Sequence, residues 1–173
     1  MSYHYLQDKP SGFLAKRLSK YKFEDTKTAS GETVKKSEVK ILIDSGAHTF
    51  FAKFDEYKAK DDKFWDDYLT KYTNWVRENK EYIFACANLD IDSIVGINKV
   101  DEWNKKYFEP LEEEGVQVCY IWHTDRGHTG WEDYCKKHSY IGLTMENDSL
   151  TVQQLMRLVN VAKKYNTRVH GMA

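Results

Sequence analysis

The chain has 173 residues, enough for one domain with a real hydrophobic core. Hydrophobic residues make up 41% and charged residues 31%, which is ordinary for a soluble globular protein. No stretch approaches the ~18 apolar residues of a membrane span, and the first residues lack the apolar run of a signal peptide. The net charge of −1 gives no general argument for nucleic-acid binding. Composition therefore predicts a cytoplasmic protein with no membrane partner.

Charge is distributed unevenly along the chain. Residues 1–40 contain nine Lys/Arg against five Asp/Glu. Such a segment either follows a phosphate backbone or is a solvated, lysine-rich surface, and the second case is the commoner one. Residues 1–39 are also rich in Ser, Thr and Lys. We therefore expect an irregular or partly ordered basic N-terminal segment over 1–39, followed by a domain over 40–173.

The three cysteines are Cys86, Cys119 and Cys135, an odd number without the CxxC spacing of redox or zinc sites. Cys86 and Cys119 lie inside apolar runs. We expect them to be small core residues of a protein in a reducing compartment.

From residue 40 onward, short apolar runs alternate with segments of helical periodicity. The apolar runs are typical of buried parallel strands and cover residues 39–44, 82–87, 116–122, 140–144 and 167–170. The periodic segments predict helices over residues 61–80, 98–114, 131–137 and 151–165. Short connections between them predict right-handed βαβ units and an α/β fold with a parallel sheet. Two architectures stay open: an open five-stranded sheet of flavodoxin-like build, or most of a (β/α)8 TIM-like barrel, which normally takes about 200 residues or more.

Every expected strand is followed by polar residues where it ends. They are Asp44, Asn88 with Asp90, His123, Thr144 with Glu146, and His170. Because ligands of parallel βα folds bind beyond the carboxyl ends of the strands, these ends predict a functional rim. Each residue also has a structural alternative: Asp44-Ser45-Gly46 is a frequent turn, and Asp90 and Asp92 suit the cap of a loop or helix.

Other chemistries have weaker signals. Asp44, His123 and His170 are candidates for a metal site, but the chain has no HxH, HExxH or paired cysteine ligands. The GxSxG, GxGxxG and GxxxxGK motifs of hydrolases and phosphate-binding loops are also absent from the sequence. His138 follows two lysines, and we expect it to be a solvated charge at a helix end. The sequence calls for no cofactor and no metal.

Five short segments, in this order, carry a family resemblance. They are Ile41-Leu42-Ile43-Asp44-Ser45-Gly46-Ala47, Asn88-Leu89-Asp90-Ile91, Trp122-His123, Tyr140-Ile141-Gly142-Leu143 and Val169-His170-Gly171-Met172-Ala173. Together they resemble the tRNA-guanine transglycosylase superfamily. The resemblance is closest to the phage and bacterial branch that installs 7-deazaguanine bases in DNA.

The resemblance implies a (β/α)8 barrel that exchanges guanine for a 7-deazaguanine through a covalent glycosyl-aspartate intermediate. Asp44 matches the family aspartate that contacts the base and takes part in proton transfer, and Asp90 resembles the aspartate that reads the donor edge of the base. Gly142 matches a glycine whose backbone approaches the base, and His170 lies where the family has a loop beneath the purine. The expected site has Asp44 as catalytic residue and Asp44, Ser45, Gly46, Asn88, Asp90, His123, Gly142 and His170 as substrate-binding residues.

The chain departs from the family pattern in three places. The family's nucleophilic aspartate lies beyond the His-Gly element and has no counterpart here, so we expect a truncated or diverged member. The C-terminal Cys/His zinc site of the tRNA enzymes is also absent, as in the DNA branch. His48 replaces the residue, usually aromatic, that follows the signature glycine by two places. Candidates for stacking on a flipped base are Phe50, Phe51 and Phe54, which suit the core equally well.

Three functions follow as hypotheses. The first is base exchange in DNA or tRNA by a transglycosylase-like protein. The second is a non-catalytic flavodoxin-like module that binds a small ligand or a protein. The third is a metal-dependent barrel hydrolase.

Overall fold

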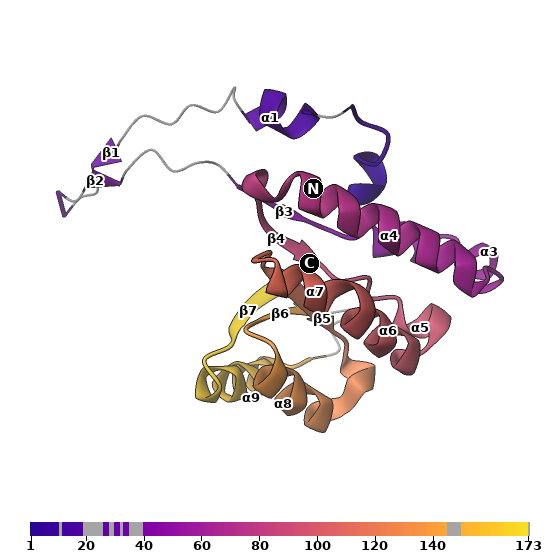
Figure 1. Cartoon of the computed structure of the whole chain (residues 1–173). Helices are drawn as coiled ribbons and strands as arrows, with labels where there is room; N and C mark the ends of the chain where they lie inside the picture. The colour runs from indigo at the N-terminus through magenta and orange to yellow at the C-terminus, as the bar shows by residue number, and fades with distance from the viewer. Residues whose placement is uncertain are drawn as a thin grey trace.

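The computed structural model describes residues 1–10, 12–18, 26–27, 30–31, 33–34, 40–144 and 150–172. In this part of the chain, a five-stranded sheet pairs its strands in chain order, and each neighbouring pair is parallel (Figure 1). The strands are β3 (Ile41–Ile43), β4 (Ile83–Ala87), β5 (Val118–Trp122), β6 (Tyr140–Thr144) and β7 (Arg168–Met172). The predicted parallel βα fold is confirmed. The described strands lack the change in strand order that defines a flavodoxin-like sheet.

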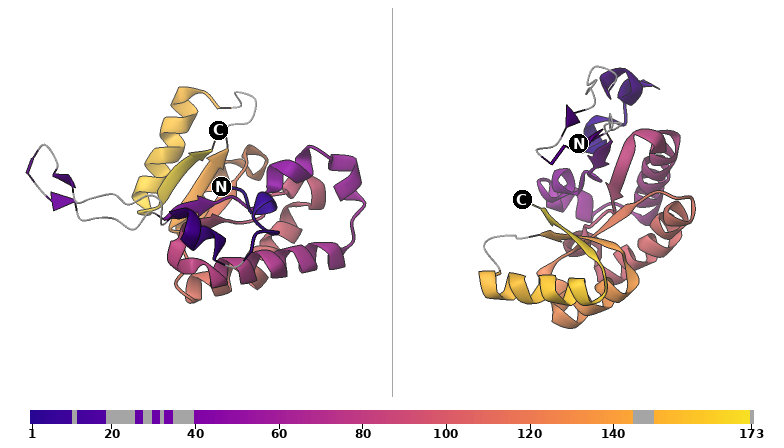
Figure 2. Two further views of the ribbon diagram at one scale, coloured as in Figure 1. Left: turned by 90° about the horizontal axis from the view of Figure 1, so that it is seen from above. Right: turned by 90° about the vertical axis from the view of Figure 1, so that its left-hand side faces the viewer.

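The sheet curls into half of a barrel (Figure 2). Small and branched side chains fill its concave face. Leu42, from one edge strand, and Met172, from the other, pack against the same inner cluster, so the curl brings both edges of the sheet to one core. The inner cluster consists of Ala85, Ala87, Cys119, Ile121 and Tyr140.

Helices cover the convex face of the sheet (Figure 2). Aromatic side chains fill the layer between them, as Trp65, Trp103 and Trp131 are each at most 2% exposed. The helices that follow the strands are α4 (Asp62–Glu78), α6 (Ile97–Trp103), α7 (Glu109–Glu113), α8 (Gly127–Lys137) and α9 (Val152–Lys164). Shorter elements at the rim are α2 (Ala47–Phe51), α3 (Phe54–Lys58), α5 (Asp92–Val95) and the 3-10 turn η4 (Thr124–Arg126), while the 3-10 turn η2 (Lys80–Tyr82) leads into β4.

The helix expected over residues 98–114 contains a π-helical turn, η3 (Asn104–Phe108), between α6 and α7. Pro110 lies two residues after the end of this turn, and a proline ring clashes with the carbonyl four residues earlier, here within η3. The wider turn relieves that clash, so the helix continues past the proline. Gly115 then ends it with a φ of 83°.

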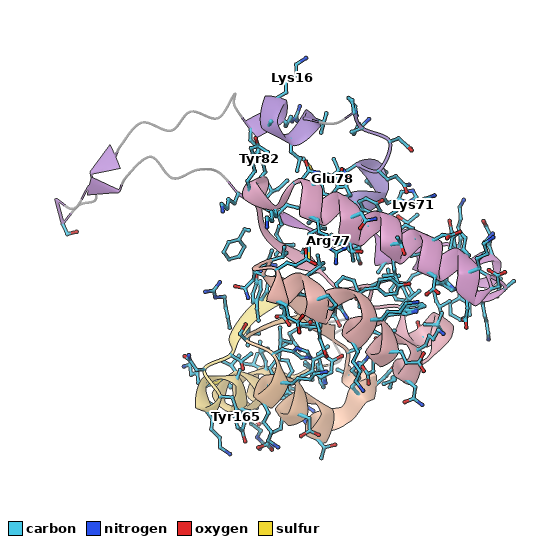
Figure 3. The ribbon with its side chains drawn as sticks, viewed as in Figure 1. Lys16, Lys71, Arg77, Glu78, Tyr82 and Tyr165 are labelled. Atoms are coloured by element: carbon cyan, nitrogen blue, oxygen red, sulfur yellow. The ribbon has the colours of Figure 1, made fainter. Side chains whose placement is uncertain are left out.

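Polar contacts join neighbouring helices. The guanidinium of Arg77 on α4 donates to both carboxylate oxygens of Glu114, after α7, at 2.9 Å (Figure 3). The hydroxyl of Tyr165, after α9, donates to Glu132 on α8 at 2.5 Å (Figure 3). The Arg77–Glu114 ion pair is exposed, so its contribution to stability is small.

Part of the N-terminal segment belongs to the domain core. Tyr3 and Leu6 join the main hydrophobic cluster, so described residues of the predicted N-terminal segment contribute to the core. Ser2 forms a parallel bridge with Asp44, beside the outer edge of β3. The elements in this region are η1 (Tyr3–Tyr5), α1 (Phe13–Leu18) and the antiparallel pair β1 (Thr26–Lys27) and β2 (Thr33–Val34).

The three cysteines are buried and form no disulfide, which confirms the core positions predicted for Cys86 and Cys119. Burial raises the pKa of the Cys86 and Cys119 thiols to about 12. Both are therefore core residues without nucleophilic reactivity at neutral pH.

The prediction of a solvated His138 is wrong. The side chain is only 4% exposed, and its ring stacks on Tyr120 of β5 with 3.6 Å between ring centroids. The Thr167 hydroxyl donates to the His138 carbonyl at 3.1 Å and covers the helix end. Burial lowers the pKa of His138 to about 3, so the ring is neutral in the folded protein.

We expect this buried ring to make the protein sensitive to mild acid. Its pKa is about 3 when folded and about 6.5 when unfolded. Between these values the unfolded chain binds one more proton, so stability is lost as pH falls below the unfolded value. The loss from this residue is about 1.4 kcal/mol per pH unit.

Urea unfolding at a series of pH values measures this slope. His138→Phe keeps an aromatic ring against Tyr120 and should flatten the slope by the equivalent of one proton. His128→Gln, at an exposed histidine of the same helix, should leave it unchanged. Equal slopes for His138→Phe and the unsubstituted protein would contradict the assignment.

Candidate functional site

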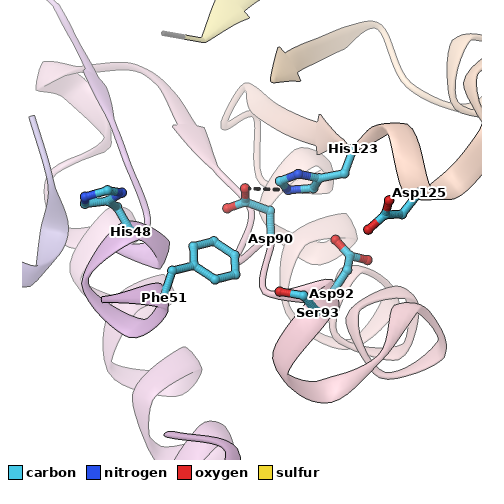
Figure 4. Close-up of a pocket in the computed structure, with 7 residues that line it drawn as sticks. All are labelled: His48, Phe51, Asp90, Asp92, Ser93, His123 and Asp125. Carbon is cyan, nitrogen blue, oxygen red and sulfur yellow. Dashed lines mark hydrogen bonds and ion pairs between the residues drawn. The ribbon is translucent and has the colours of Figure 1, made fainter. Parts of the chain in front are cut away.

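A cavity of about 410 Å³ lies at the carboxyl ends of the strands (Figure 4). Three consecutive βα connections supply its walls: the connection after β3 through α2, the connection after β4 through α5, and the connection after β5 through η4. Of the polar residues predicted at the strand ends, Asp90 and His123 line this pocket. Its lining residues are His48, Phe51, Asp90, Asp92, Ser93, His123 and Asp125.

Two of the predicted rim residues are in direct contact in this pocket. His123 Nε2 lies 3.0 Å from Asp90 Oδ2 (Figure 4), and both side chains are nearly buried, with exposures of 12% and 11%. On its other side, His123 Nδ1 lies 3.1 Å from Thr144 Oγ1. The ends of β4, β5 and β6 are therefore joined by one chain of polar side chains.

Asp44 lies beside this pocket, not in its wall. The Gly46 N–H donates to Asp44 Oδ2 at 3.3 Å, and the backbone of Ser2 and Tyr3 runs along the aspartate. Burial raises the pKa of Asp44, and the negative charge of Asp90 raises it further. A hydrogen bond with the Ser2 side chain and the Gly46 N–H act in the opposite direction. The two aspartates are thus electrostatically coupled.

Ser45 and Gly46 form a tight turn, the structural alternative for this motif. Ser45 is fully buried, and its carbonyl accepts a hydrogen bond from the Tyr68 hydroxyl at 2.6 Å. Gly46 has a φ of 93°, where a side chain would be strained. A Cβ there would also lie 3.0 Å from both His4 Cβ and Tyr68 Oη. Both residues therefore shape the turn that carries Asp44.

Asn88 has a structural role, although it was predicted to bind substrate. Its side chain is fully buried. Oδ1 accepts from the Ile121 N–H at 2.8 Å, and Nδ2 donates to Asn104 Oδ1 at 2.9 Å. Both polar atoms of the Asn88 side chain thus have partners within the protein, and Asn88 does not line the pocket.

The remaining predicted residues, Gly142 and His170, lie in the sheet away from the pocket wall. A Cβ on Gly142 would lie 2.3 Å from Ile121 Cδ1 and 3.3 Å from Cys119 Sγ, so neighbouring side chains fill the space above this glycine. His170 is half-buried on β7, with its ring 6.2 Å from the ring of Tyr140. Glu146 lies outside the described residues.

The proposed metal triad is not assembled. Over the described residues, no three His, Cys, Asp or Glu side chains are grouped to hold a metal ion. His123 has side-chain partners at both ring nitrogens, so metal coordination there would require one of those bonds to break.

Sequence reasoning missed a buried ion pair behind the pocket. The Arg126 side chain is 4% exposed; it donates to Asp92 Oδ1 and, at 2.8 Å, to Asp101 Oδ1. Burial raises the pKa of Asp92, while the Arg126 charge opposes the rise. Asp92 Oδ2 is buried without a hydrogen-bond partner in the described part of the chain. No local pattern reveals this pair, because its members lie 34 residues apart.

One of the three candidate phenylalanines is placed for ligand contact. Phe51 is half-buried and lines the pocket. Phe50 is 2% exposed and packs edge-to-face on Trp65, so it belongs to the core. Phe54 lies on α3, outside the pocket wall, beneath the Lys58 ammonium. His48 lines the pocket together with Phe51. In the sequence, His48 stood out only as a departure from the family pattern.

The pocket offers mainly hydrogen-bond acceptors. Asp90, Asp92 and Asp125 contribute carboxylates, and the nearby guanidinium of Arg126 is directed to Asp92 and Asp101. Ionised carboxylates can only accept hydrogen bonds. The arrangement therefore suits a flat ligand that presents N–H donors or positive charge, held against the Phe51 ring.

Gly142 gives a test of the packing around β6. Gly142→Ala should destabilise the protein by about 1–3 kcal/mol, because its new methyl group overlaps Ile121 Cδ1. Ile121→Val removes that Cδ1 atom, so the double variant should recover part of the loss. Denaturant unfolding of the four proteins measures the coupling. If the losses of stability in the two single variants simply add in the double variant, a contact other than Ile121 Cδ1 causes the destabilisation at position 142.

Comparisons with protein-family models, curated proteins and solved structures give no significant match. Among the described residues, none of the helices has both the length and the apolar character needed to cross a bilayer.

Proposed function

We propose that the rim pocket binds a guanine-like base and that the protein takes part in exchanging guanine for a 7-deazaguanine in DNA or tRNA. The observation that supports this most is the group of carboxylates around Asp90, which faces the same cavity as the Phe51 ring. A guanine carries N–H donors along one edge and has a flat π-face. Carboxylates can accept hydrogen bonds from the donors, and an aromatic ring can stack on the face.

The size and the acid-base chemistry of the pocket agree with this proposal. A cavity of about 410 Å³ falls within the range of about 300–1,000 Å³ that is common for small-molecule sites. A flipped nucleotide needs a pocket of this kind, because its base must leave the stack to react. Asp44 has a raised pKa beside the site, which suits a carboxyl group that exchanges protons.

The proposal extends the half-barrel to the (β/α)8 barrel of the family that the sequence resembles. In such a barrel the described strands would form one side, and the pocket would lie at the carboxyl rim. The flavodoxin-like alternative is less favoured, because the described strands pair in simple chain order. The metal-dependent hydrolase has no grouped ligands to support it among the described residues.

Base exchange can be measured directly. The protein is incubated with DNA or tRNA and isotopically labelled guanine or preQ0, and the nucleic acid is then digested and its nucleosides are weighed. We expect label in the nucleoside fraction. Calorimetry with the free base measures binding separately from exchange. Failure of both binding and exchange with either base would contradict the proposed function.

Asp90→Asn tests the carboxylate as the reader of the base. Loss of an acceptor for charge-assisted hydrogen bonds should weaken base binding by about 1.5–3 kcal/mol. The control is Asp133→Asn on α8, where the side chain is 73% exposed, and it should bind as the unsubstituted protein does.

Asp44→Ala should reduce exchange more than binding. If the Asp44→Ala variant exchanges bases at the unsubstituted rate, the assignment of Asp44 as a catalytic residue is wrong.

A further inference from the structure

The two outer edges of the five-stranded sheet differ in what covers them. Along β3, the Met1 ammonium donates to the Leu42 carbonyl at 2.9 Å, and the Tyr3 N–H donates to the Asp44 carbonyl at 2.8 Å. Along β7, no strand in the described part of the chain pairs with the side that faces away from β6. We call that side the β7 edge, and Figure 2 shows β7 at this margin of the sheet. An unpaired edge is a template for pairing with another chain.

The β7 edge presents the backbone groups of Val169 and Gly171. The Arg168 N–H donates to the Ser139 carbonyl at 2.8 Å, toward β6. Because hydrogen-bonding directions alternate along a strand, Val169 and Gly171 direct their N–H and C=O groups away from β6. A Cβ on Gly171 would meet no atom within 4 Å, so this position has free space. An extended chain can therefore reach these groups and add a strand.

Exposed apolar side chains lie on elements next to the β7 edge. Phe84 on β4 is 44% exposed, and the guanidinium carbon of Arg168 lies 5.7 Å from the centroid of its ring. On α9, which packs against β7, Val152 and Met156 are 74% and 60% exposed. These are three of the five large apolar side chains that are exposed in the described part of the chain. Apolar surface is thus available to a partner on both elements that flank the edge.

The same region is positively charged. Residues 150–172 contain four Lys/Arg and no Asp/Glu, although the whole chain has a net charge of −1. Among the residues that the structure describes, only Lys164 of these four forms an ion pair. Arg157 and Lys163 on α9 are exposed, and the Arg168 guanidinium stacks on aromatic rings. A second copy of the chain would bring the same positive charges to the edge, whereas an acidic strand would neutralise them.

We propose that the β7 edge binds an extended, acidic segment of a partner protein as an added strand. Main-chain hydrogen bonds to Val169 and Gly171 hold the segment, and its carboxylates pair with the cations of α9 and β7. Its alternate apolar side chains cover the exposed apolar surface. No residue of α9 or β7 lines the rim pocket, so this inference goes beyond the proposed function and does not depend on base binding.

A blocked peptide in which Val and Glu alternate is the probe for this edge. Fluorescence anisotropy of the labelled peptide measures its affinity for the full chain. We expect saturable binding that is weakened about tenfold or more when Lys replaces Glu in the peptide. Added salt should also weaken it, because the carboxylate contacts are exposed. No saturable binding of the acidic peptide, or equal affinity for the lysine peptide, would overturn the proposal.

Two substitutions at Gly171 separate strand addition from simple charge attraction. Gly171→Pro removes the outward N–H and leaves the pairing with β6, so it should weaken binding of the acidic peptide about tenfold or more. Gly171→Ala keeps the N–H and is the matched control, which should bind as the unsubstituted protein does. Equal affinities for the two variants would overturn the added strand.

Hydrogen exchange provides the same test without a substitution. In the unsubstituted protein, the Val169 and Gly171 amides should exchange more slowly once the acidic peptide is bound. This measurement decides the point if Gly171→Pro does not fold. Unchanged exchange of both amides at saturating peptide would contradict main-chain pairing at the β7 edge.

Further measurements distinguish the acidic segment from other partners. Arg168→Gln should lower the peptide affinity several fold, whereas Lys71→Gln on α4 (Figure 3) should leave it unchanged. A dimer in sedimentation of the protein alone that Gly171→Pro abolishes would assign the edge to a second copy and overturn the acidic partner. Tighter binding of DNA or tRNA than of the acidic peptide, lost in Arg168→Gln, would assign these charges to nucleic acid and would also overturn it.

Discussion

The parallel pairing of five strands in chain order is the constraint on which the site depends. It directs every carboxyl end to one rim, so polar residues far apart in sequence become neighbours. Asp90 and His123 are separated by 33 residues and lie in hydrogen-bond contact. On the inner face of the sheet, the absence of a side chain at Gly142 leaves room for Ile121.

Asn88 links this fold to the chemistry. The side chain bonds to the backbone of β5 and to Asn104 in η3, just where β4 ends. The side-chain oxygen of Asn88 accepts the Ile121 N–H in place of a backbone carbonyl, at the point where the chain turns away from the sheet. The next turn of the chain carries Asp90 to His123, so a buried amide with no ligand contact sets the geometry of the pocket. Its loss would cost the site as well as the fold, because its partners would be left unsatisfied.

Much of this architecture follows from periodicity in the sequence. The apolar runs predicted all five strands of the sheet, and the rule that strand ends converge predicted that Asp90 and His123 lie on the same rim. Contacts across layers were not predictable in the same way. His138 stands beside two lysines and looks solvated, yet Tyr120 from the sheet covers its ring. Arg126 becomes buried only because Asp92 and Asp101 reach it from other elements. Such pairings depend on tertiary packing, which local patterns do not contain.

We propose above all that a guanine-like base binds between Phe51 and the carboxylates of the rim. The most direct measurement is a map of backbone amide chemical shifts during titration with free 7-deazaguanine. The account predicts that the largest changes lie in the connections after β3, β4 and β5, around Phe51, Asp90 and His123. Changes confined to other surfaces, or no saturable change at any concentration reached, would contradict it.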